Sequence, residues 1–181
     1  MDSKISPKNS TKSTGKEKDL YQVSLKLLLK NSKGEILALK AVDQGSFAGY
    51  YDLPGGRIDT GEFKLSLAEI IKREAAEEIG DVKFQLWQKP VALGRHLIAA
   101  SAAGSAKDTH VLYLFFEAEL LGGEVKTSEE HTGYQWLDLN KIKLSDYFTS
   151  GILEGINMYY HWTVTLWQPL KRKSGRNTSK Q

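Results

Sequence analysis

Apolar and polar side chains alternate along residues 21–29, which is the period of a strand with one buried face. The apolar positions on that face are Val23, Leu25, Leu27 and Leu29. Residues 31–34 read Asn-Ser-Lys-Gly, a composition typical of a turn. We therefore expect residues 35–41 to form the returning strand.

The period changes to that of a helix over residues 63–79. Small and branched apolar side chains share one side of a helical wheel: Ala68, Ile71, Ala75 and Ile79. Charged side chains share the opposite side: Arg73, Glu74, Glu77 and Glu78. Gly80 is a suitable residue to end the helix. One side of this helix should face a core, and the other is free for chemistry.

Other apolar runs predict further strands and a last helix. The strands are expected at residues 50–53, 84–86, 91–98, 111–120 and 134–137. The first of them is stopped by Pro54, which cannot donate to a strand ladder. The small residues 99–105 are interpreted as a loop, and apolar positions at helical spacing predict a helix over 152–162. The order of strands, helix, strands and helix favours a mixed α/β fold.

Composition divides the chain into one domain and two tails. The 181 residues, 40% of them hydrophobic, suffice for one core. Residues 1–19 carry five Lys against three acids, and residues 169–181 carry five Lys or Arg and no acid. Both stretches are polar, and we expect them to be disordered. The net charge of the whole chain is +3, and the two tails contribute +2 and +5. Residues 20–168 therefore carry about −4, as in domains that bind cations.

Residue types that are missing restrict the chemistry. The chain has no Cys, which excludes disulfides and thiolate metal sites and favours a hard cation held by oxygen atoms. No apolar run approaches the roughly 20 residues of a membrane span. The first residues also lack the apolar core of a signal peptide. We expect a cytoplasmic protein that does not enter a membrane.

Three carboxylates are spaced to meet on one helical turn. Glu74, Glu77 and Glu78 lie at i, i+3 and i+4, where like charges repel one another unless a cation lies among them. Mg²⁺ is the usual ion of sites that combine carboxylates with substrate phosphates. Arg73 could brace one carboxylate, and Gly56 would let a backbone carbonyl approach an ion. Taken alone, a Glu-rich face is more often simply solvated.

A longer pattern surrounds these carboxylates. Gly56, five residues, Glu62 and then Arg-Glu-Ala-Ala-Glu-Glu-Ile-Gly over residues 73–80 resembles the Nudix box, G-x5-E-x7-R-E-U-x-E-E-x-G-U with U aliphatic. Here ten residues separate Glu62 from Arg73 where the box has seven, and Asp81 replaces an aliphatic residue. Leu-Pro-Gly-Gly at 53–56 and Glu-Glu-His at 129–131 are also similar to Nudix hydrolases. The resemblance covers roughly residues 20–165.

The resemblance implies a Nudix-like α/β/α sandwich with a mixed β-sheet between helices. It also implies an enzyme that uses water and Mg²⁺, or Mn²⁺ in its place, to cleave a diphosphate linkage in a small nucleoside diphosphate derivative. ADP-ribose, nucleotide sugars, NTPs and dinucleotides are the substrate types of such enzymes. Carried over by position, the metal ligands are the Gly56 carbonyl, Glu74, Glu77 and Glu78. Glu62 and Arg73 support them, and Glu130 is the distal base or extra ligand, with Glu129 as its rival.

Several interpretations remain beside this one. Arg57, Phe47 and Tyr51 stand next to the expected site and are predicted to bind substrate, although aromatic residues on short strands are more often core. His96, His110 and His131 are assigned no role. The chain could instead be a non-catalytic nucleotide sensor, or an enzyme acting on RNA 5′ ends through its basic tails. A homodimer is possible, and nucleic acid is the less favoured partner.

Overall fold

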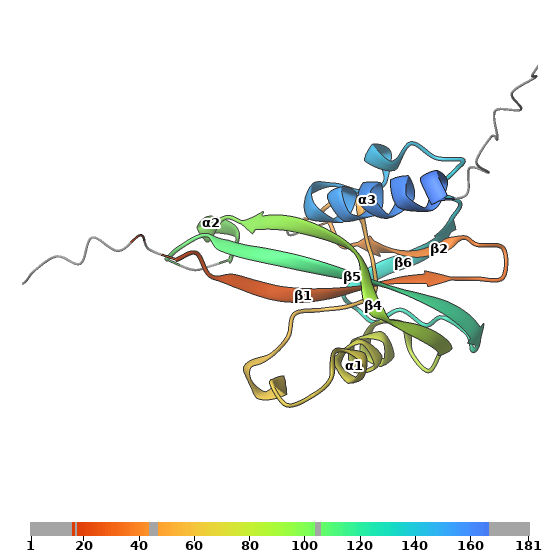
Figure 1. Ribbon diagram of the computed structural model, residues 1–181, viewed down its shortest axis with the longest axis horizontal. Coiled ribbons are helices and arrows are strands. Elements are labelled where there is room, and N and C mark those ends of the chain that lie inside the picture. Colours follow the sequence, from red (N-terminus) through yellow and green to blue (C-terminus); the bar gives the residue numbers. More distant parts are fainter. Residues whose placement is uncertain (1–15, 17, 44–46, 104–105, 167–181) are drawn as a thin grey trace, which may run out of the picture.

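A six-stranded sheet lies between two helices, one on each face (Figure 1). The computed structural model describes residues 16, 18–43, 47–103 and 106–166. Helix α1 (Leu67–Ile79) covers one face and α3 (Ser150–Leu166) covers the other. The predicted α/β/α sandwich is therefore confirmed. The stretches predicted to be disordered lie outside the described residues, except for Lys16, Lys18 and Asp19.

The sheet mixes one parallel pair with antiparallel pairs. Its strands are β1 (Tyr21–Lys30), β2 (Ile36–Ala41), β3 (Tyr51–Asp52), β4 (Lys83–Ile98), β5 (Thr109–Gly122) and β6 (His131–Leu137). The strand order is β3-β2-β1-β5-β4, and β6 pairs with β2. Strand β1 runs parallel to β5, and the other pairs are antiparallel. This arrangement agrees with the mixed fold expected from the order of elements.

Alternate side chains of β1 enter the two hydrophobic cores, one on each face of the sheet. Leu25, Leu27 and Leu29 are buried in the core beneath α1, together with Ile70 and Ile71 of that helix. Val23, on the same face, packs against this core. The opposite face of β1 turns toward α3. Ser24, Lys26 and Leu28 of this opposite face are buried as well.

The second core lies beneath α3. Leu28 of β1, Phe115 of β5 and Phe148 are fully buried there, with Ile152 and Ile156 of the helix. Helix α3 extends beyond the predicted range of 152–162 at both ends. Among the described helices, none combines the length and the apolar character needed to cross a membrane.

Strand β4 is longer than the sequence indicated. It runs through residues 83–98 as one element, although the sequence predicted separate strands at 84–86 and 91–98. The pairing with β5 shifts register between Leu86 and Pro90, so polar residues interrupt the apolar pattern without ending the strand. Because β4 is an edge strand, it also tolerates Pro90.

One helix begins later than predicted, and one short helix was not predicted. Helix α1 begins at Leu67 rather than at residue 63, because Ser66 and Glu69 form a capping box. Residues 100–103, predicted as part of a loop, form the short helix α2 (Ala100–Ala103). Asp108 accepts a hydrogen bond from the Ala100 amide at 2.9 Å, which satisfies a backbone donor at the start of this turn.

We expect Gly155→Ala to destabilise the protein. A Cβ at this position of α3 would overlap the ring of the fully buried Phe115. Overpacking of this kind costs about 1–3 kcal/mol, offset in part by the better helix propensity of Ala. Urea denaturation measures the change. Gly122→Ala is the control, since nothing lies within 4 Å of its Cβ position, and equal stability of the two variants would contradict the packing described here.

Candidate active site

The segment after β3 forms the backbone of the site. Strand β2 leaves β1 after the Lys30↔Ile36 pair, and residues 54–58 take its place along the edge of β1. Leu27 N donates to Pro54 O at 2.7 Å, and Leu25 N donates to Gly56 O at 2.8 Å. Gly55 has a φ of 131°, and a Cβ there would overlap the Leu25 carbonyl. Only glycine allows this close passage.

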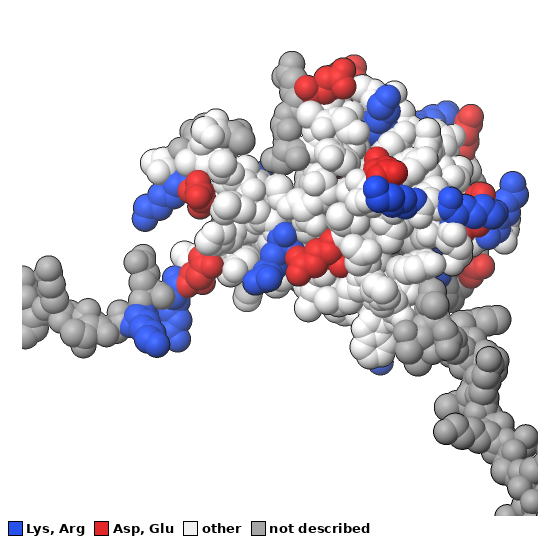
Figure 2. All heavy atoms as spheres, turned by 90° about the horizontal axis from the view of Figure 1, so that it is seen from above, with Lys and Arg blue, Asp and Glu red and all other residues white. Residues whose placement is uncertain are grey.

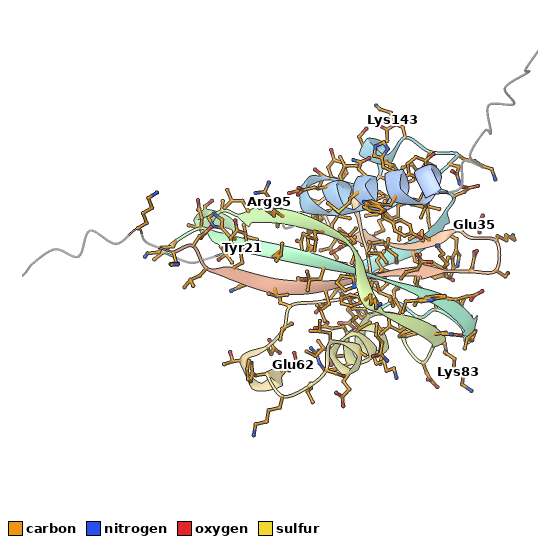
Figure 3. The ribbon with its side chains drawn as sticks, viewed as in Figure 1. Tyr21, Glu35, Glu62, Lys83, Arg95 and Lys143 are labelled. Carbon is orange, nitrogen blue, oxygen red and sulfur yellow. The ribbon has the colours of Figure 1, made fainter. Side chains whose placement is uncertain are left out.

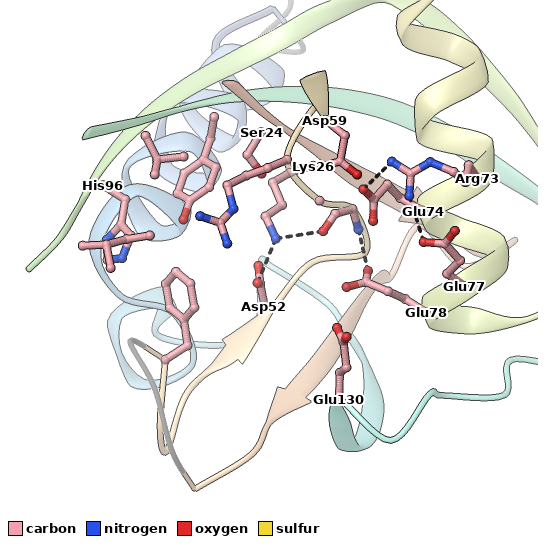
Figure 4. A pocket seen from close by; sticks show the side chains of 17 residues that line it. Ser24, Lys26, Asp52, Asp59, Arg73, Glu74, Glu77, Glu78, His96 and Glu130 are labelled. Carbon is pink, nitrogen blue, oxygen red and sulfur yellow. Dashed lines mark hydrogen bonds and ion pairs between the residues drawn. The ribbon is translucent and has the colours of Figure 1, made fainter. Parts of the chain in front are cut away.

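The same glycines bring the backbone against α1. A Cβ on Gly56 would overlap the carboxylate of Glu74. The Gly55 amide donates to Glu78 Oε2 at 2.6 Å (Figure 4). The bend therefore contacts two of the three glutamates that are predicted metal ligands, Glu74 and Glu78, which explains why the Gly-Gly pair and the helix must occur together.

Arg73 holds three carboxylates at once. Its Nε donates to Glu62 Oε1 at 2.6 Å, Nη2 donates to Glu74 Oε1 at 2.8 Å and Nη1 donates to Glu77 Oε2 at 2.8 Å. The Glu62 carboxylate and then the other two raise the pKa of Arg73. The Arg73 guanidinium, followed by the Asp59 amide, lowers the pKa of Glu62. The guanidinium fork thus fixes the orientation of side chains from the helix and from the preceding loop.

Glu62 reaches Arg73 despite the three extra residues of the box. A turn of 3-10 helix (Thr60–Glu62) precedes α1, and the Asp59 amide donates to Glu62 Oε2 at 2.9 Å. Glu62 is buried and lies on the α1 side of the sheet (Figure 3). The insertion lies in the loop before Ser66, where the Phe63 side chain is 93% exposed. The longer spacing is therefore absorbed at the surface.

The loop before β6 packs against Glu78 of α1. His131 Nε2 lies 3.3 Å from Glu78 Oε1, and both side chains are largely buried. The Ser128 amide donates to the Glu78 carbonyl at 3.0 Å. Glu130 lines the cavity described below, whereas its neighbour Glu129 is not among the 17 lining residues. His131 was assigned no role from the sequence, and its only signal there was its position beside Glu130.

Arg73, the three helical glutamates and Glu130 border a cavity of about 440 Å³. Lys26 and Asp52 form an ion pair of 2.8 Å inside it (Figure 4). The Lys26 ammonium also lies 3.3 Å from the carbonyl oxygens of Leu53 and Gly55, so its three donors have three acceptors. Lys26 thus ties β1 to the bend that carries the glycines. Sequence reasoning missed this pair because its members are 26 residues apart on separate strands.

The predicted substrate-binding residues divide into two groups. Arg57 and Phe47 line the cavity. Tyr51 lies outside it, with its ring 5.6 Å from the ring of Tyr147. Successive side chains of a strand point to opposite faces, and in β3 it is Asp52 that points into the cavity. The structure therefore does not bring Tyr51 to the site.

The charge of the cluster suits a divalent cation. Burial raises the pKa of Glu74, Arg73 lowers it, and the negative charges of Glu78 and Glu77 raise it further. Oxygen donors that repel one another in this way are stabilised by a hard cation. Among the described residues, no three acidic or His groups already surround a common point, because Arg73 and the Gly55 amide hold the glutamates. The donor set fits a metal ion, provided that these contacts rearrange.

Comparison with known proteins identifies the family. The model of the NUDIX domain matches residues 20–153. The chain belongs to the NUDIX domain family. The predicted family and the predicted class of enzyme, a Nudix-type pyrophosphohydrolase, are both confirmed.

Relatives of this Nudix protein include enzymes and solved structures. It is 29% identical over 111 residues to nucleoside triphosphatase NudI of Escherichia coli O139:H28, which covers 61% of this chain and 77% of NudI. The crystal structure of a MutT protein from Methanosarcina mazei Go1 is similar with a TM-score of 0.62 and 25% identity, over 82% of this chain and 96% of that one. A C. elegans Ap4A hydrolase has the same fold, with a TM-score of 0.54 and 21% identity over 80% and 98% of the two chains.

Replacing Arg73 by Gln should raise the pKa of Glu62 toward its ordinary value, because the cation that lowers it is removed. A carboxyl ¹³C NMR titration measures this. Since the Glu62 pKa is lowered by folding, the pair stabilises the protein above the unfolded pKa and loses that effect as pH falls through the folded one. The stability advantage of the wild type should therefore shrink on acidification.

Arg95→Gln, which changes an exposed Arg on β4, is the control for this titration and should leave the Glu62 pKa unchanged. The same titration curve for Glu62 in Arg73→Gln and in the wild type would contradict the bracing role of Arg73.

Proposed function

We propose that this Nudix protein is a Mg²⁺-dependent hydrolase that cleaves a diphosphate linkage in a nucleoside diphosphate derivative by water attack at phosphorus. One observation carries the proposal: Glu74, Glu77 and Glu78 border a single cavity beside the Gly55-Gly56 bend. The cavity is large enough for a nucleotide-sized ligand. Similarity to a nucleoside triphosphatase and to an Ap4A hydrolase supports a nucleotide-derived substrate without choosing between NTP, dinucleotide, ADP-ribose and nucleotide sugar.

The metal ligands in this proposal are Glu74, Glu77, Glu78 and the carbonyl of Gly56. The Gly56 carbonyl already accepts one hydrogen bond from Leu25, and its second lone pair remains for an ion. Mg²⁺, or Mn²⁺ as a substitute, would offset the charge of the diphosphate and make bound water easier to deprotonate. Glu77 is the most exposed of the three glutamates, so its bond to Arg73 is the easiest one to exchange.

The remaining groups position the reactants. Glu130 enters the cavity from the loop before β6 and is proposed to accept a proton from the attacking water, or to serve as a further ligand. Arg73 and Glu62 keep the carboxylates oriented. Arg57 contributes a positive charge for a phosphate group, and Phe47 contributes an aromatic surface. Phosphoryl transfer depends mainly on this kind of positioning and charge neutralisation.

Glu77→Gln and Glu78→Gln are each expected to lower Mg²⁺-dependent hydrolysis by at least about 100-fold, because each removes a charged ligand while keeping its shape. The measurement is phosphate release from ADP-ribose, a nucleotide sugar, a dinucleoside polyphosphate and NTPs. Glu119→Gln, on the exposed part of β5, is the control.

Full activity in either ligand variant would refute the proposed metal site. Binding of these compounds by the wild type without any hydrolysis would favour the alternative of a nucleotide sensor that has lost the reaction.

Glu130→Gln should lower kcat by about 10²–10⁴-fold if Glu130 is the proton acceptor. Glu129→Gln is a matched control, since it changes the adjacent carboxylate, which does not line the cavity. Initial rates over a range of pH distinguish the two variants. A larger loss in Glu129→Gln would reverse the assignment.

The alternative of an RNA 5′-end enzyme rests on the basic tails, and residues 169–181 lie outside the described residues. The face of the domain seen in Figure 2 carries acidic and basic side chains close together, so this face offers RNA no continuous basic surface. A small-molecule substrate therefore remains the preferred proposal. A homodimer and a cytoplasmic location also remain predictions.

A further inference from the structure

The cavity has two chemically different ends. The carboxylates and Arg73 lie at one end, and His96 lies at the other, with Lys26 and Asp52 between them (Figure 4). The end around His96 is lined by the aromatic or apolar side chains of Phe47, Ile98, Val111 and Tyr113, and the charge of Arg57 acts on Tyr113. A ligand with a charged diphosphate at the first end would therefore place a less polar group at the second.

The ring of His96 is held between two aromatic rings. Its centroid lies 5.1 Å from that of Phe47 and 6.1 Å from that of Tyr113, with interplanar angles of 29° and 17°. His96 is only 9% exposed. The ring is therefore buried against these two aromatic side chains, and its two nitrogen atoms are the groups that can make polar contacts.

One of these nitrogen atoms has a partner and the other has none in the described part of the chain. Nδ1 lies 2.7 Å from Ser150 Oγ, and Nε2 is buried without a hydrogen-bond partner. Ser150 opens α3 with a φ of 49°, a conformation that is unfavourable for a residue with a side chain. A buried ring nitrogen without a partner is costly, so this one calls for a polar group that the protein does not supply.

Burial favours the neutral form of the His96 imidazole. Burial lowers the pKa of His96, the charge of Asp52 raises it, and Lys26 lowers it. A neutral imidazole has one donor and one acceptor nitrogen, so Nε2 takes the role opposite to the one that Nδ1 takes toward the Ser150 hydroxyl. Nε2 can therefore pair with one complementary donor or acceptor atom on the edge of a planar heterocycle.

We propose that His96 is a specificity-determining residue, whose Nε2 hydrogen-bonds the edge of the substrate's nucleobase while its diphosphate lies among the carboxylates. The proposal rests on the proposed function, which supplies a nucleotide substrate. Phe47 is only partly buried, and a shift of its ring is the movement that gives a base access to Nε2. A polar group that must find its partner in the ligand discriminates strongly against ligands that lack it.

The test uses ligands that contain no anhydride bond and so cannot be hydrolysed. AMP, GMP, CMP, UMP and ribose 5-phosphate are titrated into the full chain with Mg²⁺ present, and binding is followed by calorimetry. We expect one nucleotide to bind at least about tenfold more tightly than ribose 5-phosphate and than the least favoured nucleotide. The ¹⁵N resonance of His96 Nε2 should shift with that nucleotide and not with ribose 5-phosphate.

His96→Phe keeps a ring between Phe47 and Tyr113 and removes both nitrogens. Its affinities for the four nucleotides should fall within about threefold of one another, with the affinity for ribose 5-phosphate unchanged. His110→Phe, at a partly exposed position on β5 outside the cavity, should retain the wild-type preference. If His96→Phe does not fold, the change in the ¹⁵N resonance of His96 Nε2 in the wild type tests the proposal by itself.

The proposal is overturned if the wild type binds all four nucleotides equally, if His96→Phe keeps the preference, or if the Nε2 resonance does not move. These outcomes are separate from the proposed reaction. A protein that hydrolyses diphosphates in a Glu77-dependent manner but treats all bases alike would retain the proposed function and lose the role of His96.

Discussion

Three carboxylates on one helical turn repel one another, and the guanidinium of Arg73 balances this repulsion in the structure. It binds Glu74 and Glu77 of the helix and Glu62 of the preceding loop, while the Gly55 amide binds Glu78. Every donor in this set is either a cation or a backbone amide, and Glu74, Glu77 and Glu78 all line the cavity. The orientation of the helix relative to the Gly-Gly bend depends on these contacts.

The bend itself depends on the divergence of two strands. Strand β2 pairs with β1 at the Lys30↔Ile36 end and then diverges from it. The backbone of residues 54–58 forms hydrogen bonds with the edge of β1 that β2 leaves free. This pairing carries the backbone to α1 and turns Asp52 toward Lys26 of β1. Carboxylates from the α1 layer and side chains from the α3 face of the sheet can therefore border one cavity. Glycine is required at position 55, because any Cβ would overlap the Leu25 carbonyl, and at position 56 a Cβ would displace the Glu74 carboxylate.

The site combines two environments that suit different parts of one molecule. Closely spaced negative charge at one end favours cations and, through them, phosphate groups. At the other end, a neutral imidazole between aromatic rings favours a flat, weakly polar group. The buried Lys26–Asp52 pair separates these regions and cancels its own charge within the cavity. Charge and shape thus vary along the cavity in the same order as along a nucleotide diphosphate.

Local sequence patterns were sufficient to predict the features that depend on one periodicity or one residue spacing. The alternation in β1 identified the face beneath α1, and the i, i+3, i+4 spacing identified the carboxylates of that helix. Patterns failed where neighbours in space supplied the missing support. Strand β4 continues through polar residues because β5 pairs with it, and α2 forms where Asp108 satisfies a backbone amide. The pattern of short strands also could not show that Tyr51 faces away from the cavity and Asp52 into it.

The sequence by itself determined the family, the mixed α/β class and the helix that carries the acidic side chains, because these depend on residues close together in the chain. Only the tertiary structure decided that Glu62 still reaches Arg73 and that Glu130 rather than Glu129 lines the cavity. It alone brought His131 to Glu78 and left His96 Nε2 without a partner. These contacts join residues 11 to 54 positions apart, and such distances are set by how strands pair and layers pack rather than by local spacing.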